Sequence, residues 1–152
     1  MHCSTFDQKY TSLKSKGRLI GLDVGEKRTG IAVTDAFQLI ASPLEGVETS
    51  QLTKRLRELI LEEECVGIIV GLPLRLHGEM SEIEGLIQKF VRSWEQLFRD
   101  IPISRVDERF TSKMASASLF DSGVSKKNRR DKFLIDATSA AIILQSYLNQ
   151  RR

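Results

Sequence analysis

The sequence predicts an α/β protein built on a mixed β-sheet with helices on both faces. Three observations lead to this prediction. Two β-rich runs, 19–22 and 30–34, flank a short turn that contains glycine, as in a β-hairpin. A continuous run of mostly β-branched residues, 66–71, is typical of a central strand that is buried on both faces. Apolar residues at helical spacing between the later runs indicate helices that connect the strands.

The elements are expected in the order β-β-β-α-β-α-β-α-α. The hairpin covers 18–35, and a third strand is expected over 39–47, at a sheet edge because Pro43 lacks a backbone donor. The later elements are expected as follows: a helix capped by Thr49 or Ser50 and running to 60, a strand over 66–71, a helix over 83–98 with a capping box of Ser81 and Glu84, a strand over 101–106, a helix over 113–120 and a helix over 135–150. Three antiparallel strands followed by two parallel strands make a five-stranded mixed sheet. The apolar stripe of 83–98, which includes Leu86, Trp94 and Leu97, is assigned to the core.

Length and composition indicate one globular domain over 18–152, preceded by a flexible polar extension, 1–17, without the apolar segment of a signal peptide. The net charge of +3 and the pI of about 9.0 favour a polyanionic partner only weakly. Cys3 and Cys65 are far apart and lack metal-ligand spacing, which fits a reducing, cytoplasmic location. No apolar stretch approaches the ~20 residues of a membrane span, so no membrane partner is expected.

Three acids stand at the ends of predicted elements. Asp23 closes the first strand although Asp is a poor strand former, Glu108 follows the last strand, and Asp136 lies at the start of the last helix. Parallel strands end at the same edge of a sheet, where ligands of open α/β sheets bind. We therefore expect these three carboxylates to converge. Taken singly, each has a simpler explanation, as a surface acid or as an acid near a helix start.

Clustered carboxylates repel one another unless a cation neutralises them. Ligation by oxygen atoms alone selects a hard ion, Mg²⁺ or Mn²⁺. Two such ions ~4 Å apart can activate a water and stabilise the leaving oxygen in phosphodiester cleavage. The three acids thus predict a two-ion nuclease site.

Basic residues near these acids predict contacts with phosphates. The hairpin turn combines Gly25, which has no Cβ, with two cations, and the run 125–132 packs five basic residues into eight. A solvated charge run is the simpler alternative for this basic segment. The residues expected to contact nucleic acid are Gly25, Lys27, Arg28, Arg109, Lys126, Lys127, Arg129, Arg130 and Lys132.

Four segments resemble the successive motifs of the YqgF/RuvX family: DVGEKRTGIAVTD, GLPLRLHGEMS, VDERFTS and KFLIDATSAAIILQ. The resemblance extends from Gly17 to about Gln150. It implies a ribonuclease H-like fold and places the family's acidic positions at Asp23, Glu108 and Asp136. The family is described as Holliday junction resolvases and as nucleases that process the 5′ end of precursor 16S ribosomal RNA.

Several readings remain open. Structured RNA is favoured over branched DNA, because a junction resolvase works as a two-fold dimer and no dimer interface stands out, so a monomer is favoured over a dimer. A non-catalytic nucleic-acid-binding module would bind without metal-dependent cleavage. An actin- or sugar-kinase-like ATPase would need a second phosphate loop, for which this chain is too short.

Overall fold

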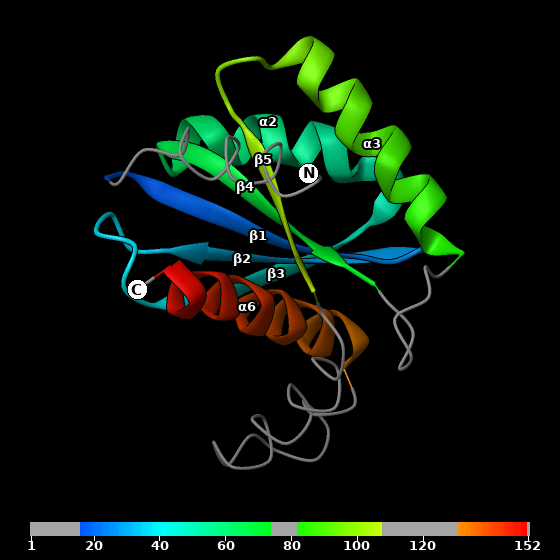
Figure 1. The fold of residues 1–152 in the computed structure, drawn as a ribbon. Helices are drawn as coiled ribbons and strands as arrows, with labels where there is room; N and C mark the ends of the chain where they lie inside the picture. Colours follow the sequence, from blue (N-terminus) through cyan, green and yellow to red (C-terminus); the bar gives the residue numbers. More distant parts are fainter. Residues whose placement is uncertain (1–15, 74–81, 108–130, 152) are drawn as a thin grey trace, which may run out of the picture.

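A computed structural model describes residues 16–73, 82–107 and 131–151, and its sheet has the strand order β3-β2-β1-β4-β5 (Figure 1). The strands are β1 (Arg18–Val24), β2 (Arg28–Thr34), β3 (Ala41–Glu48), β4 (Cys65–Leu72) and β5 (Ile103–Asp107). β2 pairs antiparallel with both β1 and β3, whereas β4 pairs parallel with β1 and β5. The predicted five-stranded mixed sheet is therefore confirmed, with β3 at an edge.

Helices cover both faces of this sheet. Figure 1 shows α2 (Leu52–Glu62) and α3 (Ile83–Leu97) over one face and α6 (Lys132–Arg151) across the other. A short 3-10 turn, η1 (Thr49–Gln51), leads from β3 into α2. None of the helices in the described parts of the chain is long and apolar enough to cross a membrane.

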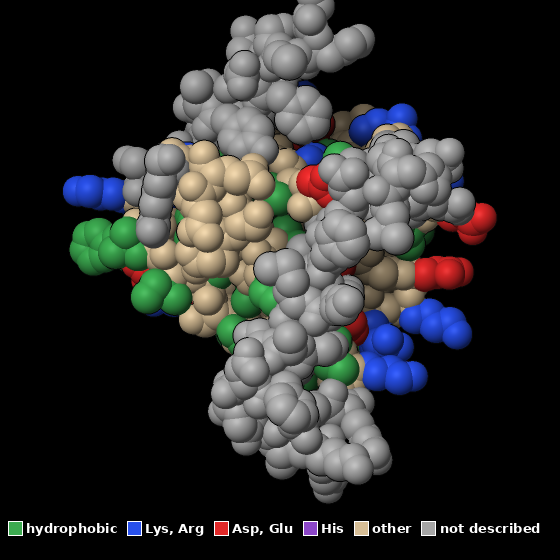
Figure 2. Space-filling view, turned by 60° about the horizontal axis from the view of Figure 1, so that its bottom comes forward, with side chains coloured by type: hydrophobic (Ala, Val, Ile, Leu, Met, Phe, Trp, Pro, Cys, Tyr) green, Lys and Arg blue, Asp and Glu red, His purple; other side chains and the backbone are tan. Residues whose placement is uncertain are grey.

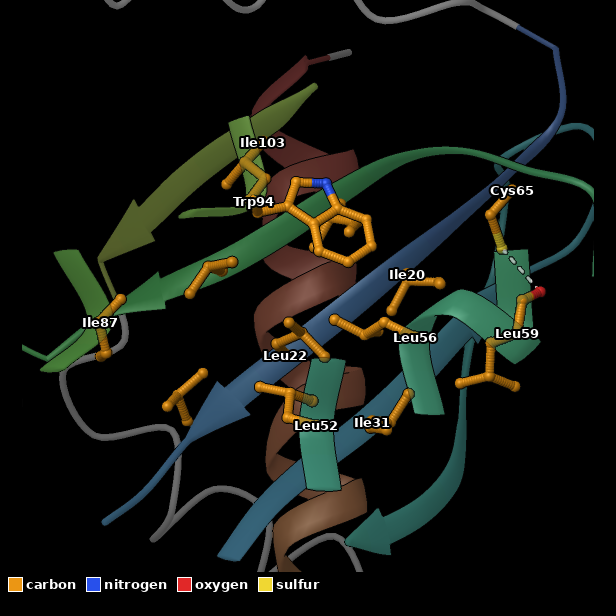
Figure 3. Packing of buried hydrophobic residues seen from close by; sticks show 13 residues of the cluster. Ile20, Leu22, Ile31, Leu52, Leu56, Leu59, Cys65, Ile87, Trp94 and Ile103 are labelled. Carbon is orange, nitrogen blue, oxygen red and sulfur yellow. Dashed lines mark hydrogen bonds between the residues drawn. The ribbon is translucent and has the colours of Figure 1, made fainter. Parts of the chain in front are cut away.

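The first core lies between the sheet and the pair α2 and α3 (Figure 3). Alternate residues of the strands point into it, among them Ile20 and Leu22 of β1. Each helix contributes the apolar residues of the face that it turns toward the sheet. Leu56 of α2 is fully buried, and Trp94 of α3 is 1% exposed. The indole Nε1 of Trp94 donates to the carbonyl of Ile101 at 3.2 Å, so the polar atom of this large side chain is satisfied.

The second core lies beneath α6, and glycines let this helix approach the sheet closely. A Cβ added at Gly21 of β1 would lie 2.7 Å from Leu144 Cβ, and one at Gly46 of β3 would lie 2.6 Å from the Phe133 ring. Contacts this short would force the helix away from the strands. α6 therefore packs directly on the glycines of β1 and β3, and this close packing fixes its position across the sheet.

Several predicted boundaries differ from the structure. β3 begins at Ala41 rather than at 39. α6 begins at Lys132, three residues earlier than predicted, because the Asp131 carboxylate accepts the backbone N–H of Phe133 at 2.9 Å, in the manner of an N-cap. Asp136 consequently lies beyond the first turn of this helix. Residues 1–15 of the predicted flexible extension 1–17, Ser81 and the helix 113–120 lie outside the described residues. Gly17 is held by hydrogen bonds with Ala36 and Gln38.

Three side-chain predictions differ from the structure. Leu86 and Leu97 of α3 are 41% and 62% exposed, so the apolar stripe of this helix is only partly buried. Neither Thr49 nor Ser50 caps α2; the N-cap position is Gln51, without a side-chain hydrogen bond. Glu84 does not complete a capping box at Glu82, the N-cap of α3; its carboxylate faces β5 instead.

The loop from β2 to β3 is organised by the carboxylate of Asp35. Its oxygens accept the backbone N–H groups of Ile40 at 2.8 Å, Leu39 at 2.9 Å and Phe37 at 3.0 Å. These donors, led by Ile40, hold the pKa of the Asp35 carboxyl below its usual range. Because the pKa is lower in the folded protein, this contribution to stability is present above the unfolded pKa of about 4 and is lost as the pH falls through the folded pKa.

We expect Asp35→Ala to lower the Tm at pH 7 by roughly 2–4 °C, because three backbone donors lose their acceptor in a largely exposed loop. Thermal unfolding monitored by circular dichroism between pH 2 and pH 7 checks this. The difference from the unmodified protein should shrink at the acidic end, where the carboxyl is protonated in both states. Asp100→Ala, which removes another exposed acid, serves as the control. A difference independent of pH would contradict the assigned role of the carboxylate.

Candidate active site

Asp23 lies near the carboxyl end of β1, on the face of the sheet that α6 covers. Alternation along the strand places it on the same side as Leu19, which belongs to the core beneath α6, and Gly21, which contacts this helix. Asp23 is half-buried and pairs across the ladder with Gly30 of β2. Asp23 therefore lies on the face of β1 whose other residues, Leu19 and Gly21, pack against α6.

Asp136 is brought to this place by the close seating of α6. A Cβ added at Gly30 would overlap the carbonyl group of Asp136 and would lie 2.8 Å from the backbone nitrogen of Ala137. The backbone of Asp136 thus lies directly over the residue that pairs with Asp23, and paired residues point to the same face of a sheet. The backbone of Asp136 therefore lies close to the strand position of Asp23, although the two residues are far apart in the sequence; their joint role in a site stays a prediction.

The Asp136 carboxylate is held by Arg28. The guanidinium Nε donates to Oδ2 at 3.0 Å, and the two side chains are 35% and 21% exposed. Arg28 was predicted to contact nucleic acid, and in the structure its guanidinium binds Asp136. The pair spans 108 positions, and no local pattern in the sequence indicates it.

The third predicted acid, Glu108, lies outside the described residues. It follows Asp107, the last residue of β5, which is in register with Leu72 at the end of β4. β1, β4 and β5 run parallel, so their carboxyl ends share one edge of the sheet. β5 therefore ends at the same edge as β1, and a role for Glu108 at this edge stays a prediction.

The hairpin turn next to Asp23 is fixed by contacts within the turn and with Thr49. A Cβ at Gly25 would lie 2.5 Å from the carbonyl oxygen of Arg28, which accepts the Gly25 N–H at 2.9 Å. Glycine is thus required by the turn itself, a reason that differs from the predicted approach of a ligand. Thr49 donates its hydroxyl to the Gly25 carbonyl at 2.6 Å, and its N–H to the Lys27 carbonyl at 2.9 Å. This clamp holds the exposed Lys27 beside the acids.

The remaining predicted nucleic-acid contacts are mostly beyond the described chain. Lys132 is exposed at the start of α6. The space-filling view shows Lys and Arg side chains at the margins of the face it presents, some of them beside Asp and Glu (Figure 2). The predicted nucleic-acid contacts that lie outside the described residues are Arg109, Lys126, Lys127, Arg129 and Arg130.

A groove of about 580 Å³ lies beside the hairpin turn. One wall comes from the turn and the other from the start of α3. The described residues that line it are Val24, Gly25, Glu26, Glu82, Ile83 and Leu86. Val24 belongs to the core on the side of α2 and α3, so the groove lies at the carboxyl end of β1, on the face opposite to that of Asp23.

The donor chemistry of Asp23 and Asp136 suits a hard divalent cation, because both offer only carboxylate oxygens. Within the described residues no three acidic, histidine or cysteine side chains gather closely enough to hold a metal ion. The site described so far therefore supplies two of the three predicted carboxylates.

Comparison with known proteins identifies the family. A family model described as "RuvX: Holliday junction resolvase" matches residues 17–150. The chain belongs to the RuvX family. This confirms the resemblance found in the four sequence motifs.

Curated RuvX relatives cover nearly the same length. A "Putative pre-16S rRNA nuclease" of Flavobacterium johnsoniae is 45% identical over 135 residues, which are 89% of this chain and 98% of the relative. A protein of the same name from Christiangramia forsetii is 47% identical over 131 residues, which are 86% of this chain and 97% of the relative.

Solved structures share the fold of this RuvX chain. The structure "T. thermophilus RuvC in complex with Holliday junction substrate" matches with a TM-score of 0.57 and 20% identity, covering 89% of this chain and 95% of RuvC. The yeast mitochondrial Holliday junction resolvase Ydc2 matches with a TM-score of 0.50 and 9% identity, covering 97% of this chain and 85% of Ydc2. The predicted ribonuclease H-like fold is thus confirmed.

Proposed function

We propose that this RuvX protein is a nuclease that hydrolyses phosphodiester bonds and requires a divalent metal ion, Mg²⁺ or Mn²⁺. The observation that supports the proposal is the seating of α6 on Gly30, which puts the backbone of Asp136 over the residue that pairs with Asp23. Two carboxylates at one edge of the sheet repel each other and are stabilised by a cation. Membership of the RuvX family supports the same activity.

Asp23, Glu108 and Asp136 are the proposed ligands of a two-ion site. A bound pair of divalent ions supplies a water of lowered pKa and neutralises the charge that develops on the phosphate. Arg28 orients the Asp136 carboxylate through the 3.0 Å contact. The clamp formed by Thr49 keeps the turn that carries Lys27 in place, where its ammonium can contact a phosphate.

The proposed substrate is structured RNA, the 5′ end of precursor 16S ribosomal RNA, in the cytoplasm. The names of the relatives support this choice. Cleavage of one strand near an RNA end requires one active site, so we propose a monomer. The sequence favoured a monomer because the apolar stripe of α3 was assigned to the core and left no dimer interface. Leu86 and Leu97 of this stripe are exposed, so this reason no longer supports a monomer. The second candidate is resolution of Holliday junctions, which the description of the family model favours.

Paired cleavage assays distinguish these functions. The protein is incubated with a precursor 16S 5′ leader and with a synthetic four-way DNA junction, in Mg²⁺, in Mn²⁺ and in EDTA, and its mass is measured by sedimentation. We expect a monomer that cuts the leader only with metal. A dimer that nicks the junction symmetrically and ignores the RNA would establish the second candidate. Binding without cleavage under all conditions would indicate a non-catalytic module.

The basic segment provides a separate prediction. Neutralising Lys126, Lys127, Arg129 and Arg130 to Gln should weaken nucleic-acid binding for all sequences, because cations that contact phosphates release counterions without reading bases. The slope of log affinity against log salt should fall by roughly one unit for each lost contact. Fluorescence anisotropy titrations at several salt concentrations measure this slope. Replacing Arg57 and Arg92, which are exposed on α2 and α3, by Gln gives a control that also removes positive charge. An unchanged slope in the variant of the basic segment would mean that this segment is a solvated charge run without phosphate contacts.

A further inference from the structure

A buried ion pair lies outside the proposed ligand set, between β5 and the first turn of α3. Arg105 Nη2 donates to Glu84 Oε2 at 3.1 Å, and Nη1 lies 2.7 Å from Oε1. The second contact is an ion contact without hydrogen-bond alignment, since Oε1 has no hydrogen-bond partner among the described residues. The Glu84 side chain is 4% exposed and the Arg105 side chain 15%. A carboxylate buried to this extent is stable only while its partner is present.

The same guanidinium also binds the end of β4. Its Nη2 donates to the Gly71 carbonyl at 2.9 Å, and its Nε to the Val70 carbonyl at 3.3 Å. Val70 is in register with Leu22, the residue before Asp23. A single side chain therefore connects β5, the carboxyl end of β4 and α3 at the edge where the acids lie.

We propose that Arg105 and Glu84 are positioning residues for the nuclease site, an inference that rests on the proposed function. Arg105 holds the end of β4 beside Asp23, and Glu84 holds the start of α3 against β5. The start of α3 is one wall of the groove beside the hairpin turn that follows Asp23, with Ile83 next to Glu84. Loss of the common anchor allows this wall and the strand ends to move relative to Asp23. A displacement of about 1 Å at reacting groups can cost on the order of 10²-fold in rate.

The first test compares Arg105→Lys and Glu84→Gln with the unmodified protein. A lysine keeps the charge but cannot bind the carboxylate and both carbonyls with one planar fork. We expect the single-turnover cleavage rate to fall by about 10- to 100-fold, while the affinity for the RNA stays within about twofold. Arg18→Lys is the matched control, because Arg18 pairs with Glu63 at 2.8 Å at the opposite end of β1. An unchanged rate in both variants, or an equal fall in the control, would overturn the proposal.

An apolar double variant, Glu84→Leu with Arg105→Met, separates positioning from stability. Removing both charges together avoids an unpaired buried charge, so the Tm should recover relative to the single variants. Cleavage should remain low, because methionine cannot hold the carbonyls of β4. Recovery of cleavage together with the Tm would mean that the pair acts on stability alone.

Hydrogen exchange tests the positioning without any cleavage assay. In Arg105→Lys and Glu84→Gln, the amides of 22–25 and 70–72 should exchange about tenfold faster than in the unmodified protein, and those at the start of β1 should be unchanged. The unmodified protein's own cleavage assay reports on the proposed function, so a failure there is distinguished from a failure here. Unchanged exchange at 22–25 and 70–72 would refute the positioning role, including when the double variant does not fold.

Discussion

Asp23→Asn should abolish metal-dependent cleavage and leave the fold intact. Asparagine has nearly the shape of aspartate but lacks the negative charge that strengthens the binding of a divalent cation. Asp23 is half-buried near the end of β1 and is one of the three proposed ligands of the two-ion site. We expect the rate to fall by about 10³-fold, the upper range for losing one group that stabilises a developing charge.

Cleavage rates, the Tm and the affinity for Mn²⁺ measured by calorimetry check this result. Glu26→Gln is the matched control, since it removes one exposed carboxylate from the adjoining turn without touching a proposed ligand. The control should keep its cleavage rate within a few-fold. A folded Asp23→Asn protein that cleaves and binds Mn²⁺ normally would refute the two-ion site.

Gly30→Ala should strongly destabilise the protein. The added methyl group would overlap the Asp136 carbonyl, which belongs to helix backbone and cannot turn aside as a flexible side chain could. The helix must shift as a whole, so we expect a loss of about 3 kcal/mol or more in the free energy of unfolding, at the upper end for overpacked sites. Cleavage should fall as well, because the shift separates Asp136 from Asp23.

Gly85→Ala is the matched control for this substitution. Gly85 is exposed on α3, and a Cβ there would meet no atom within 4 Å. Alanine favours a helix over glycine by about 1 kcal/mol, so this variant should be slightly more stable than the unmodified protein. Urea unfolding of both variants measures the difference. Equal stability of Gly30→Ala and the unmodified protein would contradict the close seating of α6.

Most of the fold could be predicted because its signals are local. The hairpin around Gly25, the buried run of β4 and Pro43 on an edge strand each follow from a few adjacent residues. The start of α6 was missed although Asp131 is a good N-cap residue, since it stands within a run of basic residues that indicates a loop. The exposure of Leu86 could not be predicted, because helical spacing does not tell how wide the buried stripe is.

The site was predictable only as far as topology determines it. Parallel strands ending at one edge led to Asp23, and a helix packed across that edge led to Asp136. The contact of Arg28 with Asp136 and the clamp formed by Thr49 connect segments that meet only in the folded chain. Gly30 carried a usable signal, a glycine within a β-rich run, which often marks a close approach of another backbone.

The seating of α6 on the sheet also bears on how the protein is made. The ribosome synthesises every strand of the sheet before α6, yet this helix covers the second core and carries Asp136. A nascent chain that has completed β1 to β5 therefore exposes the apolar face of its sheet and has no Asp136 beside Asp23. The proposed site is thus assembled only after the last helix has been synthesised.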